Sequence, residues 1–140
     1  MKTVKHCRYM AMILLVLAVG SLLTGCVIRQ GREKIADLEY TVVRPADLPE
    51  TLASQIEAKK EAEFTLTYSD NEFLYIARGY GEQETGGYSI QVKACYLAEN
   101  AICVSTLLTG PSPGEQVSTA PSYPYLVLKT ELREEQVVFE

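Results

Sequence analysis

Residues 73–96 read FLYIARGYGEQETGGYSIQVKACY, and this stretch sets the plan of the fold. Two runs rich in aromatic and β-branched residues, 73–80 and 88–96, are typical of strands and flank a polar, acidic loop. The loop holds Gly86 and Gly87, which take positive φ at little steric cost, so the chain is expected to turn sharply there. Paired glycines mark turns, but they also allow a close approach to the backbone, and both interpretations stay open.

The chain around this stretch predicts a mainly β domain. Residues 64–68 alternate with period two and form a predicted hairpin with residues 72–80. Further strands are predicted at residues 39–44, 102–106, 123–129 and 137–139. Short strands, tight turns and one helix indicate an α+β fold, an antiparallel β-sandwich or a strongly bent sheet, of which the immunoglobulin-like sandwich is one form.

One amphipathic helix is predicted near residues 47–62. Asp47 is suited to cap the first free N–H groups of that helix. Leu48, Leu52 and Ile56 are spaced by four and share one face. Because this apolar stripe is narrow, the helix is expected to cover one face of a sheet.

The two cysteines of the β domain are candidates for a disulfide. A three-residue turn over residues 98–100, with Asn100 in the left-handed conformation, would place Cys95 directly opposite Cys103 and away from the apolar strand face. Opposed Cβ atoms lie about 4.5–5.5 Å apart and a disulfide needs about 3.5–4.5 Å, so slight closing would allow the bond. The alternative is two free thiols in a hairpin that is out of register by one residue.

The N-terminus predicts export and lipid anchoring. A basic segment without acids precedes an apolar run over residues 10–23, the form of a secretory signal. The following LTGC at 23–26 resembles the lipobox of bacterial lipoproteins, which implies acylation of Cys26, with palmitate among the chains, and cleavage after Gly25. The alternative is an ordinary signal peptide with a chance cysteine.

These features predict three parts and a location. Residues 1–25 are the expected lipoprotein signal peptide, residues 26–38 a polar tether, and residues 39–140 the β domain. Acyl chains on Cys26 would hold the protein at the extracytoplasmic face of a cell membrane, because each buried CH₂ adds roughly 0.8 kcal/mol.

The amino-acid composition excludes several classes of function. Removal of residues 1–25 would leave 115 residues with 10 Lys and Arg against 18 Asp and Glu, a net charge of −8. Such a domain is a poor match for nucleic acid, whose affinity depends on Lys and Arg. The one histidine, His6, would leave with the signal, which excludes Ser-His-Asp and Cys-His catalysis and a His-ligated zinc. No cofactor or metal is expected.

Carboxylate-pair hydrolysis is the one enzymatic interpretation left. Glu82 and Glu84 share the central loop, and a glycosidase needs two carboxyl groups about 5–10 Å apart. The sequence has no Trp, and no stretch indicates an aromatic sugar platform. We therefore expect that the protein is not an enzyme.

Four short motifs carry a family resemblance. Residues 75–82 read YIARGYGE, residues 85–90 TGGYSI, residues 113–115 PGE and residues 123–125 YPY. Together they resemble the C-terminal domain of the PrcB family, whose members are components of a protease complex, over roughly residues 48–139. The resemblance implies a non-catalytic lipoprotein that assists or stabilises a secreted or surface protease.

A fainter similarity concerns chagasin-type inhibitors of papain-like cysteine proteases, which present three loops at one end of an immunoglobulin-like sandwich. Residues 85–88 would stand in the first loop, residues 110–114 near the second, and Pro124-Tyr125 in the third. Several inhibitor motif residues are replaced here, including Asn-Pro by Gln83-Glu84. These replacements weaken the similarity, so direct inhibition is kept only as an alternative function. A structural envelope lipoprotein without a protease client is another alternative.

The expected function is protein binding. The candidate contacts are Thr85, Gly86, Gly87, Tyr88, Pro124 and Tyr125. Tyrosine offers a large contact area at low entropic cost, which suits a binding patch. The alternative is that both tyrosines point into the core and that the glycines only turn the chain.

Overall fold

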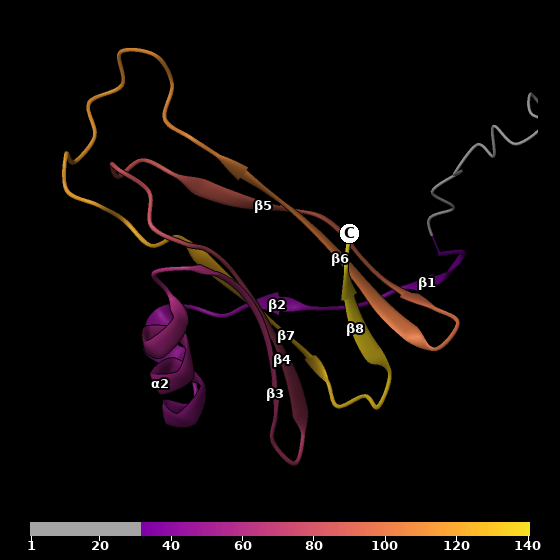
Figure 1. The fold of residues 1–140 in the computed structure, drawn as a ribbon. Coiled ribbons are helices and arrows are strands. Elements are labelled where there is room, and N and C mark those ends of the chain that lie inside the picture. The colour runs from indigo at the N-terminus through magenta and orange to yellow at the C-terminus, as the bar shows by residue number, and fades with distance from the viewer. Residues whose placement is uncertain (1–31) are drawn as a thin grey trace, which may run out of the picture. The chain divides into compact units, whose positions relative to one another are not determined.

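The computed structural model describes residues 32–140, which form two four-stranded sheets and one α-helix (Figure 1). The strands are β1 Lys34–Asp37, β2 Thr41–Val42, β3 Glu63–Ser69, β4 Phe73–Tyr80, β5 Ser89–Ala98, β6 Ala101–Thr109, β7 Tyr125–Glu131 and β8 Gln136–Phe139. The first sheet has the order β1-β5-β6-β8, and the second has the order β2-β7-β4-β3. Only the β6–β8 pair is parallel within the described residues. The predicted mainly β, sandwich-like fold is confirmed.

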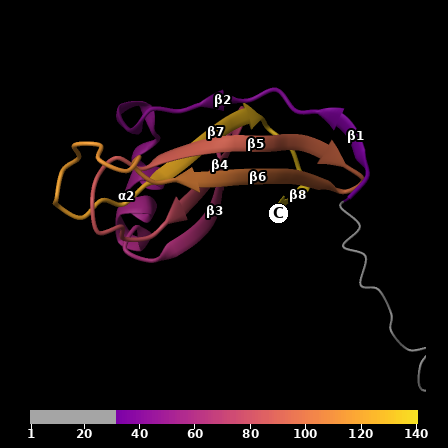
Figure 2. The same cartoon turned by 90° about the horizontal axis from the view of Figure 1, so that it is seen from above.

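The two sheets have one connected side and one open side. Residues 38–40 lead the chain from β1 in the first sheet to β2 in the second (Figure 2). At the opposite side, which we call the open side, β3 and β8 are the edge strands of their sheets and do not pair with each other.

Alternation along β4 builds two apolar layers. Leu74 and Ile76 join the cluster between the sheets, together with Ile102 and Val104 of β6. Tyr75 and Ala77 point to the other face, which the helix α2 (Glu50–Lys59) covers. The period of two explains this division, since neighbouring side chains of a strand face opposite ways.

The helix buries the face predicted for it but starts later than predicted. Leu52 and Ile56 are fully buried against the second sheet. The predicted cap at Asp47 is wrong, because a 3₁₀ turn over Pro45–Asp47 precedes the helix and the residue at its N-cap is Pro49. The Asp47 carboxylate instead accepts a hydrogen bond from Arg44 Nε at 2.7 Å.

The β3–β4 hairpin is confirmed. Its pairs run without interruption from Glu63↔Tyr80 to Ser69↔Leu74. Asp70 closes the turn, since its carboxylate accepts the backbone N–H groups of Glu72 at 2.9 Å and Phe73 at 2.7 Å. These two hydrogen bonds lower the pKa of Asp70, because they stabilise the charged form.

The predicted register at the closed end of the β5–β6 hairpin is wrong. Cys95 pairs with Val104, and Cys103 pairs with Tyr96. The turn has two residues between the paired Ala98 and Ala101, and Asn100 takes the left-handed conformation that was expected, with φ 63°. A bulge at Lys93 is the physical cause, because it adds one residue to β5 between the pairs of Val92 and Ala94.

The expected disulfide is therefore not formed, and both thiols are free and buried. A shift of one residue sends neighbouring side chains to opposite faces of a sheet. Cys95 accordingly packs in the cluster between the sheets, whereas Cys103 packs with Ala98 and Ala101 in a separate cluster.

The folded domain begins before residue 38, where the predicted tether was expected to end. Lys34–Asp37 forms β1 and pairs with β5, and Leu38 is buried in the core. The signal peptide over residues 1–25 and the lipidation site Cys26 lie outside the described residues. In the part that is described, no helix is long and apolar enough to span a membrane.

Candidate functional site

Two loops meet at one end of the sandwich. Residues 81–88 connect β4 to β5, and residues 110–124 connect β6 to β7. The longer loop projects past the start of β5 and returns toward β7 (Figure 1). We call these two segments the paired loops, because backbone hydrogen bonds join them.

Ser122 is the centre of this pairing. Its N–H donates to Gln83 O at 3.0 Å, and Gln83 N donates to Ser122 O at 2.8 Å. Its hydroxyl also donates to Thr85 O at 2.6 Å. Further along, Gly86 N donates to Ser118 O at 2.9 Å. Four hydrogen bonds therefore hold the candidate residues Thr85 and Gly86 against the longer loop.

The two candidate glycines have different roles. Gly87 has φ 85°, and an added Cβ would lie 2.4 Å from Val117 Cγ1 and 3.0 Å from Pro111 Cβ. Gly86 is not among the residues with positive φ in the described part, and an added Cβ would lie 3.3 Å from Ser118 Cβ. Gly87 is thus required by backbone conformation and by space, whereas Gly86 has one close neighbour and no conformation that calls for glycine.

The longer loop contains a rigid turn. Gly114 has φ 81°, and Glu115 N donates to Ser112 O at 3.0 Å across Pro113-Gly114. These features are those of a type II turn, in which proline precedes a residue with positive φ.

The candidate aromatic residues do not form one patch. Tyr88 is half-buried, and its ring lies over Gly110, where an added Cβ would be 3.2 Å from Tyr88 Cε1. Tyr125 packs against the cluster beneath α2, and burial raises the pKa of its hydroxyl. Pro124 contributes its carbonyl, which accepts the N–H of Tyr80 at 3.1 Å.

Tyr123 was not among the predicted contacts, although it joins the paired loops to the helix. Its hydroxyl donates to the Glu82 carboxylate at 3.0 Å, a bond that raises the pKa of Tyr123. Lys60, just after α2, lies over the ring with its Nζ 5.2 Å from the centroid. The aromatic–proline–aromatic step at residues 123–125 was the signal in the sequence, but it did not distinguish the tyrosine that bonds to Glu82 from the one that packs beneath α2.

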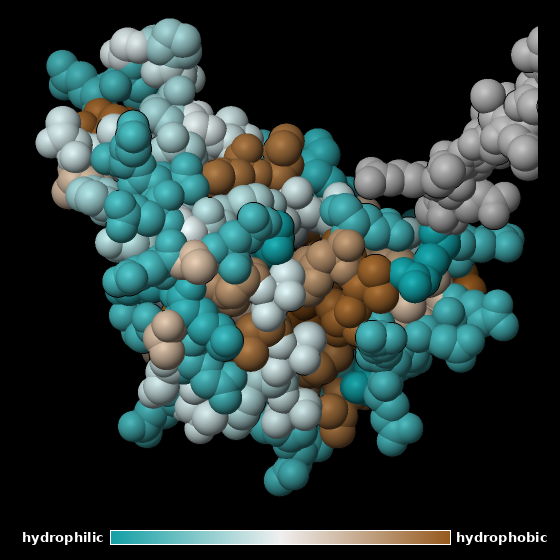
Figure 3. Space-filling model, in the orientation of Figure 1, coloured by the Kyte–Doolittle hydropathy of each residue, from teal (hydrophilic) through white to brown (hydrophobic). Residues whose placement is uncertain are grey.

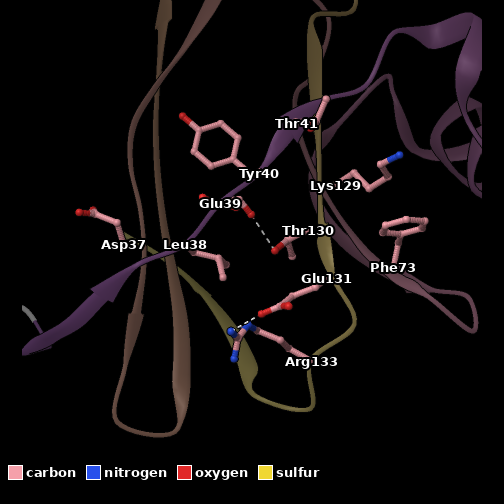
Figure 4. Close-up of a pocket in the computed structure, with 10 residues that line it drawn as sticks. All are labelled: Asp37, Leu38, Glu39, Tyr40, Thr41, Phe73, Lys129, Thr130, Glu131 and Arg133. Atoms are coloured by element: carbon pink, nitrogen blue, oxygen red, sulfur yellow. Dashed lines mark hydrogen bonds and ion pairs between the residues drawn. The ribbon is translucent and has the colours of Figure 1, made fainter.

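A separate hollow lies where residues 38–40 lead the chain from the first sheet to the second. This cavity of about 850 Å³ is lined by Asp37, Leu38, Glu39, Tyr40, Thr41, Phe73, Lys129, Thr130, Glu131 and Arg133 (Figure 4). Thr130 Oγ1 donates to Glu39 O at 2.9 Å, which fixes the crossing segment to β7. Arg133 is paired with Glu131, and Lys129 Nζ lies 4.5 Å from the Phe73 ring centroid. No motif in the sequence indicates this hollow, since its walls come from three separate parts of the chain.

The fold and the paired loops define a β-sandwich domain that presents loops from a rigid scaffold, an arrangement common at binding sites. Residues 74–131 match the family described as PrcB C-terminal. The match runs from β4 to β7 and includes both paired loops, so it confirms the family predicted from the sequence motifs. No curated protein and no solved structure matches the chain, and none of these comparisons shows the similarity to chagasin-type inhibitors.

Proposed function

We propose that this chain is a lipid-anchored, extracytoplasmic and non-catalytic subunit that binds and stabilises a secreted or surface protease. The observation that carries this proposal is the PrcB C-terminal match over residues 74–131. A lipobox-like LTGC at 23–26 supports the anchor and the location. Protein partners are the expected ligands, because the family name is that of a component of a protease complex.

The paired loops are the proposed contact surface. They lie inside the family segment, and four hydrogen bonds order them in the unbound domain. A loop that is already ordered loses less conformational entropy on binding, which favours affinity. Residues 118–121 of the longer loop are exposed and offer the surface beside Thr85 and Gly86.

The test is purification of the tagged full chain from surface-crosslinked cells that produce it. Thr119→Arg places a long cation on the exposed longer loop, and Thr51→Arg makes the same change on exposed α2. We expect a protease to co-purify with the wild type and with Thr51→Arg, and to be lost with Thr119→Arg. A protease retained by all three chains would remove the site from the paired loops, and its absence from all three would contradict the function.

The anchor is tested separately with Cys26→Ser. We expect the wild type in the detergent-extracted membrane fraction, with a mass on the N-terminal peptide that includes acyl chains. The variant is expected to leave that fraction. An unmodified Cys26 in the membrane fraction would contradict lipidation.

Direct inhibition is the second candidate, and one observation favours it. The three segments compared with inhibitor loops lie at the same end of the sandwich, since Gly86 bonds to Ser118, Tyr88 covers Gly110 and Pro124 bonds to Tyr80. Dose-dependent loss of papain activity with the purified chain would support it. Full activity at a large excess of the chain would exclude it for this class of protease.

A further inference from the structure

The open side of the sandwich exposes a groove of mixed polar and apolar lining between β3 and β8. The groove has a volume of about 420 Å³, and its walls include Leu74, Val137 and Phe139. Figure 3 shows apolar surface gathered on this side, between the β3–β4 hairpin and β8. The helix α2 does not close the groove, because its buried residues pack on the opposite face of the second sheet.

The edge of β3 is open along its whole length. β3 is the last strand of its sheet and pairs only with β4. Asp70 N donates to Phe73 O at 3.1 Å, and Tyr80 N donates to Pro124 O at 3.1 Å on the β7 side. Because hydrogen-bonded and non-bonded pairs alternate in antiparallel strands, the N–H and C=O groups of Glu63, Thr65, Thr67 and Ser69 face the open edge.

The other edges of the described sheets are short or interrupted. β2 has two residues and β8 has four. The β1–β5 pairing is irregular after Lys34, and the edge of β5 beyond β1 carries the bulge at Lys93. Bulges, lysines and short length are the usual means by which proteins blunt an edge. β3 has seven residues with no bulge, lysine or proline, so it is the edge best suited to accept another strand.

The negative charge of the open side indicates which kind of strand could bind to β3. Six carboxylates lie along the open side or at the ends of its strands, namely Glu63, Asp70, Glu72, Glu134, Glu135 and Glu140. The two arginines there, Arg78 and Arg133, are already paired with Glu63 and Glu135. Excess negative charge disfavours a second copy of this chain and favours a basic partner.

We infer that β3 accepts an extended segment of a protein partner as an added strand. The segment has apolar residues at alternate positions and Lys or Arg at its flanks. Its backbone pairs with Thr65 and Thr67, its apolar side chains fill the groove against Val137 and Phe139, and its cations meet the flanking carboxylates. The edge strands lie outside the family segment, so this inference rests on the proposed function only in that the occupant is a protein.

A peptide library tests the inference on the full chain in detergent. The probe is a library of extended random peptides, selected for binding to the wild type and sequenced. We expect enriched peptides to alternate apolar and polar residues and to carry flanking Lys or Arg. Absence of enrichment, or enrichment of sequences without this alternation, would overturn the inference.

Substitutions of Thr67 locate the binding. Thr67→Pro removes an N–H that faces the open edge and leaves the β3–β4 hydrogen bonds in place, a position at which edge strands tolerate proline. Thr67→Ala removes the side chain and keeps the N–H. We expect enriched peptides to bind Thr67→Pro at least about tenfold more weakly and to bind Thr67→Ala like the wild type. Equal binding to both variants would place the peptides elsewhere.

Hydrogen exchange separates a folding defect from a blocked edge. The Thr65 and Thr67 amides of the wild type are expected to become protected when a selected peptide binds, because they acquire partners. Thr67→Pro should retain the exchange pattern of β4, which shows that the hairpin is intact. Protection in the free chain that grows with its concentration would instead indicate β3–β3 pairing between copies and would overturn the inference. Loss of protease co-purification in Thr119→Arg has no bearing on these readouts, so the two proposals fail separately.

Discussion

The peptide groups of Gln83 and Ser122 bond to each other in both directions, at 2.8 Å and 3.0 Å. This isolated bridge joins segments that are far apart in the chain and lies outside every named strand. It ties the short loop after β4 to the long loop before β7. The shape of the candidate binding surface therefore depends on this contact as well as on the two glycines.

Ser122→Ala is expected to loosen the paired loops without unfolding the sandwich. The change removes the hydrogen bond from the Ser122 hydroxyl to Thr85 O, which contributes about 0.5–1.5 kcal/mol to the free energy of unfolding. We expect faster amide exchange at Gly86, measured by hydrogen exchange. Ser112→Ala, on the exposed turn of the same loop, is the control. Unchanged exchange at Gly86 would show that the hydroxyl does not hold the loop.

Gly87→Ala and Gly114→Ala separate the cost of steric overlap from the cost of the left-handed backbone conformation. Both glycines have positive φ, 85° and 81°, but only Gly87 has close neighbours, whereas an added Cβ at Gly114 meets nothing within 4 Å. We expect Gly114→Ala to lower the free energy of unfolding by about 1–2 kcal/mol, the cost of the left-handed conformation. Gly87→Ala should cost a further 1–3 kcal/mol or so, because its Cβ would overlap Val117.

A second substitution checks the cause. Val117→Ala should restore part of the loss in Gly87→Ala, since it removes the methyl group nearest to the added Cβ. Denaturant unfolding of the single and double variants measures the difference. Equal losses at Gly87 and Gly114 would contradict the packing argument.

The β3–β4 hairpin shows what the sequence can predict. Its residues alternate with period two, and Asp70 bonds to nearby backbone groups, so the turn and the register follow from local chemistry. The β5–β6 hairpin shows the limit. The register that would place Cys95 opposite Cys103 is the one that holds from Ser89↔Thr109 to Val92↔Thr106, but the bulge at Lys93 shifts the remainder by one residue. Nothing in the side-chain pattern marks a bulge at Lys93.

The candidate site was predictable to a similar degree. The turn at Gly87 was found because a positive φ strongly favours glycine. The contact of Gln83 with Ser122 was not, because backbone hydrogen bonds between distant loops leave no pattern in the sequence. The packing of Tyr125 under α2 depends on the helix position, which the misplaced cap at Asp47 did not define.

The two buried cysteines are expected to resist modification in the native protein. Burial raises the pKa of Cys95 to about 11, so at pH 8 very little of it is the reactive thiolate, and Cys103 has no exposed surface. Iodoacetamide followed by mass mapping should find both unmodified in buffer and both modified in guanidinium without a reductant. A peptide pair joined through Cys95 and Cys103 would contradict the observed register.

Asp70 is expected to make the stability of the protein depend on pH in the acid range. Its carboxylate accepts two backbone N–H groups of the β3–β4 turn, which lowers its pKa in the folded state. Protonation is therefore easier in the unfolded chain, where an aspartate has a pKa of about 3.9. The stabilisation is fully present above that value and is lost as the pH falls toward the lowered folded pKa.

Asp70→Asn tests this link, because the amide keeps an oxygen acceptor and removes the charge. We expect the variant to be less stable than the wild type above a pH of about 4, and the gap to narrow as the pH falls further. Denaturant midpoints measured across the acid range give the comparison. Glu72→Gln is the control, because the Glu72 carboxylate lies in the same turn but accepts neither hydrogen bond. This variant should show the same change of stability with pH as the wild type. A constant gap between Asp70→Asn and the wild type at every pH would mean that the charge of Asp70 does not stabilise the turn.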